Sequence, residues 1–85
     1  MTRKEKALHR LLSVPSDLTW DELKRALGAF GYVENTKGKT AGSRRVFKAE
    51  GLPDIRLHAP HNPPVVRRYA IEDVIATLKA EGLIE

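Results

Sequence analysis

The spacing of apolar residues changes twice along this chain of 85 residues, and this change limits the folds that the chain can adopt. Up to about Ala29, apolar residues recur every three or four positions, as in helices that bury one face. Between about Tyr32 and His58 they alternate with polar residues, as in strands that bury one face. Helical spacing returns from about Tyr69. The chain is therefore predicted to form helices, then strands, then a helix, in a single domain over residues 1–85.

Two helices are expected in the first third of the chain. The first spans Lys4 to Leu12. The second begins at a capping box, in which Thr19 is the N-cap and Glu22 reaches back to it, and it runs to about Ala29. Each has one apolar face, formed by Ala7, Leu8, Leu11 and Leu12 in the first and by Trp20, Leu23, Leu27 and Phe30 in the second.

Three short strands follow, Tyr32 to Thr36, Arg44 to Ala49 and Asp54 to His58, and then a proline-rich irregular segment. A last helix is predicted from about Tyr69 to Glu81, and Gly82 ends it. An antiparallel meander of three strands needs one covered face, which helices can supply. The predicted fold is therefore α+β, a three-stranded antiparallel sheet covered on one face by helices, in the order α-α-β-β-β-α.

The apolar stripes of these elements predict the core. Val46 and Phe47 are neighbours in one strand, so they cannot both face the helices unless a bulge intervenes. Glu72 and Asp73 are expected in the first turn of the last helix, where the helix dipole favours acids. The residues expected to supply most of the buried apolar area are Trp20, Leu23, Leu27, Val46, Phe47, Ile55, Leu57, Ile71, Val74, Ile75 and Leu78.

The positive charge of the chain is concentrated in one segment. Thr36 to Ala49 contains five basic residues and no acid, whereas the rest of the chain has ten Lys or Arg against eleven Asp or Glu, so the surplus of +4 comes from this segment. Two histidines, His58 and His61, follow closely. Such a basic segment beside imidazoles suits the binding or cleavage of a phosphodiester, although it also fits a solvated hairpin. The residues predicted to contact phosphate are Lys37, Lys39, Ser43, Arg44, Arg45 and Lys48.

The composition argues against disulfide, metal and membrane-spanning sites in this chain. It has no cysteine, so neither a disulfide framework nor a thiolate zinc site is expected. His58 and His61 are too few ligands for a metal ion by themselves, so no metal or other cofactor is expected. No apolar run is long enough to span a bilayer, and the basic segment Met1 to Arg10 is not followed by an apolar signal-peptide region. The cytoplasm is the expected location, with no membrane partner.

Several short motifs are spread over nearly the whole chain: Leu18 to Leu23, Gly31-Tyr32, Lys39 to Ser43 with Phe47, Leu57 to His61, and Gly82-Leu83. In this order they resemble the HicA family, the small ribonuclease toxins of type II toxin–antitoxin systems. The fold of this family is similar to a double-stranded-RNA-binding domain. The resemblance implies a metal-independent endoribonuclease that cleaves mRNA, an mRNA interferase, and a HicB-like antitoxin that neutralises it in a hetero-oligomer.

The chain departs from the family pattern at two places. Many members read Gly-Ser-His in the second strand and use that histidine in catalysis, whereas this chain has Arg44 after Gly42-Ser43. The resemblance to a subgroup with a basic residue at this point moves the imidazole role to the third strand, where His58 and His61 are the predicted catalytic residues. Members of that subgroup continue with Gly-Asn, whereas this chain continues with Asn62-Pro63-Pro64.

Cleavage of RNA without a metal needs a base for the 2′-hydroxyl, an acid for the leaving 5′-oxygen and cations for the charged intermediate. Histidine suits both proton transfers because it changes charge near neutral pH. Lys39, Arg44 and Arg45 are predicted to stabilise the phosphate, and His58 is predicted to share an exposed sheet face with Arg45. Two alternatives remain: a non-catalytic double-stranded-RNA-binding module that uses the same basic patch, and a protein-binding domain that docks an acidic partner.

Overall fold

A computed structural model of the chain describes residues 2–35, 44–60 and 64–84. Its three strands form one antiparallel sheet in the order β1-β2-β3, so the predicted α+β fold and the order α-α-β-β-β-α are confirmed. The elements are α1 (Arg3–Leu12), α2 (Trp20–Gly28), β1 (Val33–Asn35), β2 (Arg44–Lys48), β3 (Ile55–His58) and α3 (Arg68–Ala80).

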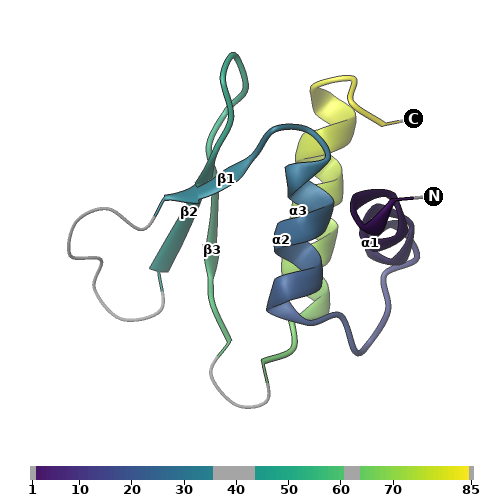
Figure 1. The fold of residues 1–85 in the computed structure, drawn as a ribbon. Coiled ribbons are helices and arrows are strands. Elements are labelled where there is room, and N and C mark those ends of the chain that lie inside the picture. Colours follow the sequence, from purple (N-terminus) through teal and green to yellow (C-terminus); the bar gives the residue numbers. More distant parts are fainter. Residues whose placement is uncertain (1, 36–43, 61–63, 85) are drawn as a thin grey trace.

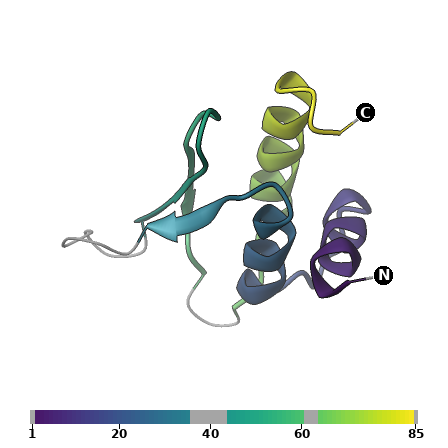
Figure 2. The ribbon, with the colours of Figure 1, turned by 45° about the horizontal axis from the view of Figure 1, so that its top comes forward.

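All three helices lie on one side of the sheet (Figures 1 and 2). Helices α2 and α3 are next to the sheet, where α2 contacts β1 and α3 contacts β3, and α1 packs on their far side. We call the sheet face toward the helices the inner face and the opposite one the outer face. No described helix or strand covers the outer face.

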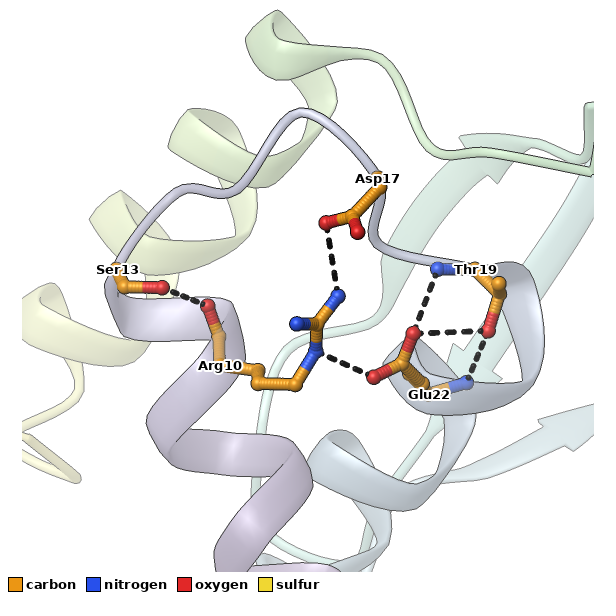
Figure 3. Close-up of polar contacts among 5 residues, drawn as sticks. All are labelled: Arg10, Ser13, Asp17, Thr19 and Glu22. Atoms are coloured by element: carbon orange, nitrogen blue, oxygen red, sulfur yellow. Dashed lines mark hydrogen bonds and ion pairs between the residues drawn. The ribbon is translucent and has the colours of Figure 1, made fainter.

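The start of α2 is held by the predicted capping box. The hydroxyl of Thr19 accepts a hydrogen bond from the backbone N–H of Glu22 (3.2 Å), and the Glu22 carboxylate accepts one from the backbone N–H of Thr19 (3.2 Å). Arg10 of α1 donates to the same carboxylate and, at 2.9 Å, to Asp17 in the α1–α2 loop (Figure 3). The polar network therefore ties the end of α1 to the start of α2.

This network lowers the pKa of Glu22. Burial alone raises that pKa, but the backbone N–H of Thr19 and the guanidinium of Arg10 bind the ionised carboxylate, and together they bring the pKa below its ordinary value of 4.5. Glu22 is therefore a carboxylate whose charge favours the folded state.

The core lies between the inner face and the helices. Most predicted core residues are buried, and Trp20, Leu57 and Ile75 are partly buried against them. Phe47 is buried beside Trp20, with ring centroids 5.5 Å apart, which ties β2 to the start of α2. The prediction that Val46 belongs to the core was wrong. Val46 is only half-buried and lies on the outer face, because its neighbour Phe47 points to the inner face.

A second pairing joins distant segments and was not predicted. The backbone N–H of Val66 donates to the carbonyl of Leu18 (2.7 Å), and that of Trp20 donates to the carbonyl of Pro64 (3.0 Å). Leu18 and Val66 are both buried. The segment that leads into α3 is therefore fixed against the residues that begin α2.

The start of α3 and the position of Tyr32 differ from the predictions. Helix α3 begins at Arg68, so Glu72 and Asp73 lie beyond its first turn, which contains no acid. The prediction of acids in that turn was wrong because the helix starts before Tyr69. Tyr32 precedes β1 and is buried, and its hydroxyl donates to the carbonyl of Pro53 at 2.7 Å.

Candidate functional site

The pairing of β2 with β3 decides which side chains share a face of the sheet. Phe47 pairs with Ile55, and both are buried, so this pair marks the inner face. Residues directly opposite each other in an antiparallel pair point to the same face, and so do residues two positions apart in one strand. The residues that point to the outer face are therefore Arg44, Val46 and Lys48 of β2 and Arg56 and His58 of β3.

His58 lies in a basic environment on this outer face. It pairs directly with Arg44, and such opposite residues have Cβ atoms about 4.5–5.5 Å apart. Arg56 is two positions from His58 in the same strand, which corresponds to about 6.6 Å along β3. All three residues are exposed. We call these three residues, Arg44, Arg56 and His58, the outer-face cluster.

Arg56 was not among the predicted site residues, although the sequence contains the signal for it. Arg56 and His58 occupy alternate positions of one strand, opposite in parity to the core residue Ile55. A face assignment based on Ile55 therefore brings Arg56 to the side of His58. The prediction selected cations from the basic segment 36–49 and overlooked this one.

The expectation that Arg45 shares an exposed face with His58 was wrong. Arg45 pairs with Leu57 and lies on the inner face. Its Nε atom is 3.2 Å from one carboxylate oxygen of Glu34, and the other oxygen of that carboxylate is 3.4 Å from the ammonium of Lys24. The Glu34 side chain is only 9% exposed. Arg45 is on this face because its strand alternates around Phe47, and the nearly buried Glu34 of β1 supplies a partner for its charge.

Lys48 lies on the outer face but at the other end of it. Its ammonium is 2.9 Å from the carboxylate of Asp54, and the same carboxylate oxygen is 3.8 Å from the guanidinium of Arg56. This end of the face therefore contains an acid beside its cations. Within residues 2–35, 44–60 and 64–84, none of the ion pairs involves Arg44 at the opposite end.

The remaining predicted site residues, Lys37, Lys39, Ser43 and His61, lie outside the described residues, so their roles stay predictions. Within the ranges that the structure describes, no three His, Asp or Glu side chains are grouped so that they could hold a metal ion. Among the same residues, no helix has both the length and the apolar character that a membrane crossing requires.

Comparisons with known proteins identify no relative of this chain. No protein-family model matches it, and neither the curated proteins nor the solved structures contain a match. Sequence motifs and the chemistry of the outer-face cluster are therefore the two guides to its function.

Proposed function

We propose that this chain is an RNA-cleaving toxin of the HicA type, a metal-independent endoribonuclease that acts on mRNA and is neutralised by a cognate antitoxin. The observation that carries the proposal is the β2–β3 register, in which His58 lies directly opposite Arg44, with both side chains exposed on a face that no described helix or strand covers. An imidazole next to a guanidinium combines a group that moves protons with a group that binds phosphate. The motifs shared with the HicA family support the same assignment.

In the proposed reaction, His58 takes the proton of a ribose 2′-hydroxyl, and the 2′-oxygen forms a bond to the adjacent phosphorus. The bond from phosphorus to the 5′-oxygen then breaks, and an acid protonates that leaving oxygen. His61 is the candidate for this acid. Arg44 stabilises the negative charge that builds up on the phosphate oxygens during this exchange. The products are a 2′,3′-cyclic phosphate and a 5′-hydroxyl.

The choice of His58 as the base follows from its place in the fold. It is the last residue of β3, which is hydrogen-bonded to β2 along its length. A strand within a sheet holds a side chain in a fixed direction more precisely than a loop does, and proton transfer requires that precision.

The proposal is tested with purified chain and a defined RNA. We expect cleavage that yields a 2′,3′-cyclic phosphate, that continues in excess EDTA, and that fails on RNA with a single 2′-deoxy substitution at the cleaved position. The deoxy substrate is the matched control, because it lacks only the proposed nucleophile. Products with a 3′-hydroxyl, or cleavage that EDTA abolishes, would contradict this mechanism.

The neutralising partner is tested separately. We expect the chain to arrest growth when it is expressed alone, and to be tolerated when a small acidic protein encoded beside it is expressed with it. Since the outer face carries Arg44 and Arg56 and none of the described helices lies on it, an acidic antitoxin would bind there and block access to His58. Arrest that continues in the presence of every neighbouring reading frame would contradict the toxin–antitoxin assignment.

A non-catalytic RNA-binding module is the second candidate, and the residue that favours it is Arg44. An arginine there increases the positive charge of the outer face at the position where many HicA proteins have their catalytic histidine. This alternative predicts that the chain retains duplex RNA at low salt and leaves it intact. Retention without any cyclic-phosphate product would favour the module over the nuclease.

A further inference from the structure

We infer that Arg56 is the second phosphate-binding arginine of the outer-face cluster and contacts the phosphate on which His58 acts. This inference deepens the proposed function and depends on it. Besides Arg44, the described strands supply three cations, Arg45, Lys48 and Arg56, and these differ in whether they can reach the same phosphate as Arg44.

Position on the sheet favours Arg56. Arg44 lies across from His58, and Arg56 lies two positions along from His58, diagonally opposite Arg44. Diagonal neighbours are about 7–8 Å apart, a distance that two arginine side chains can close onto one group between them. The residue directly opposite Arg56 is Val46, whose side chain has no charge to compete for an anion. The two guanidinium groups therefore lie on two sides of the imidazole.

Arg45 and Lys48 are less suitable as phosphate ligands because each is already paired with a carboxylate. Arg45 is on the inner face, 3.2 Å from a carboxylate that is only 9% exposed. Lys48 is 2.9 Å from Asp54, at the far end of β2 from Arg44. Moving either cation to a phosphate would first require it to leave a close acidic partner.

The ion pair of Arg56 is weaker by geometry. Its guanidinium is 3.8 Å from the Asp54 oxygen that Lys48 also approaches, which is beyond hydrogen-bond distance. The Arg56 side chain is 77% exposed. An exposed ion pair of this kind contributes little to stability, so a phosphate can replace the carboxylate at small cost. Arg56 is thus close enough to His58, and weakly enough paired, to bind the same phosphate.

The chemical role follows from the guanidinium shape. Its planar fork donates two parallel hydrogen bonds to phosphate oxygens, which a lysine ammonium cannot do. As the 2′-oxygen attacks, negative charge builds up on those oxygens, and a second arginine stabilises it. Removal of Arg56 should therefore slow cleavage by about 10- to 100-fold, the usual range for a lost hydrogen bond to a charged group.

Arg68 provides a matched control. It lies at the start of α3, on the helix side of the sheet, its side chain is 79% exposed, and it is 3.7 Å from Glu72. Arg56→Gln and Arg68→Gln therefore make the same change in charge, at almost the same exposure, next to an acid at almost the same distance. They differ in the face of the molecule that loses the charge.

The experiment measures cleavage rate and the salt dependence of RNA binding for the parent, Arg56→Gln, Arg68→Gln and Arg56→Lys. We expect Arg56→Gln to cleave more slowly and to lose about 0.7–0.9 from the log–log salt slope, as for one phosphate contact, and Arg68→Gln to match the parent. Arg56→Lys should recover the slope but not the rate, since it restores the charge without the fork. Since Arg56 is exposed, we expect Arg56→Lys to fold like the parent, so a slower rate in this variant would not come from a loss of folding.

The outcomes separate the inference from the function on which it depends. If the parent cleaves RNA and Arg56→Gln equals Arg68→Gln in rate and slope, the inference is wrong and the nuclease assignment stands. If the parent binds RNA without cleaving it, the nuclease assignment fails, and a flatter slope in Arg56→Gln alone still supports Arg56 as a phosphate contact. If the parent binds no RNA, both are wrong.

Discussion

The two faces of the small sheet use neighbouring residues of one strand for different purposes. On the inner face, Phe47 is buried against the helices and Arg45 is paired with Glu34. On the outer face, Arg44 lies opposite His58, and Val46 is only half-buried. Adjacent positions in a strand point to opposite faces. Of two neighbouring residues, one therefore contributes to the packing of the core and the other to the candidate site. We therefore expect substitutions on the inner face to change stability and substitutions on the outer face to change activity.

The largest expected difference concerns Phe47 and its neighbour Val46. Phe47→Ala should lower the free energy of unfolding by about 3–5 kcal/mol, because it removes a buried aromatic ring and leaves a cavity beside Trp20. Val46→Ala should cost less than about 1 kcal/mol, because that side chain is half-exposed on the outer face. Urea unfolding followed by circular dichroism measures both. Equal losses would mean that the outer face is covered in solution.

The next prediction concerns the histidine of the outer face. His58→Ala should slow RNA cleavage by about 10²-fold or more, the contribution of a general base, and leave RNA affinity nearly unchanged. It should also leave stability unchanged, because His58 is exposed. Single-turnover cleavage and filter binding, with His61→Ala for comparison, measure these effects. If only His61→Ala slows the reaction, the base is His61, and if neither does, the histidine mechanism is wrong.

A smaller effect is expected far from both faces, at the capping box of α2. Because folding lowers the pKa of Glu22, its charge stabilises the fold fully above its unfolded pKa near 4.5, and this contribution disappears as the pH falls through the folded value. Glu22→Gln should cost about 1 kcal/mol at pH 7, and the difference from the parent should shrink on acidification. Glu50→Gln, an exposed acid, is the control and should change stability little at either pH. A difference that persists at pH 3 would show that packing, and not the charge, is responsible.

Local patterns predicted much of this fold. The capping box at Thr19 and the apolar stripe of α2 depend on residues within a few positions of each other, and both are confirmed. The alternation around Phe47 and Ile55 also predicts the sheet faces once one of these residues is known to be buried. The pairing of Leu18 with Val66 could not be predicted, because it joins segments far apart in the chain and neither has a pattern that specifies the other.

The error about Arg45 has a different origin. A charged residue in a basic segment was expected to be exposed beside the histidine, although its own strand pattern places it with Phe47. What makes the inner position acceptable is Glu34 of β1, and that contact depends on the register between β1 and β2. The alternation of residues within one strand does not determine its register with a second strand. That register is set by how the two strands are joined and packed. Charge alone is therefore a poor guide to which cations form a site.

The smallest expected effect is also the most direct test of the boundary, because it compares two adjacent arginines. Arg44→Gln should flatten the log–log dependence of RNA affinity on salt by about 0.7–0.9, since a lost phosphate contact releases one fewer counterion. Arg45→Gln should leave this slope unchanged and instead lower the stability by about 1 kcal/mol, because it removes one of the cations that pair with the nearly buried Glu34. The two variants lose the same charge from neighbouring positions, so any non-specific effect of net charge cancels between them. If both flatten the slope equally, RNA responds to the charge of the whole strand, and the division between an inner structural face and an outer binding face is wrong.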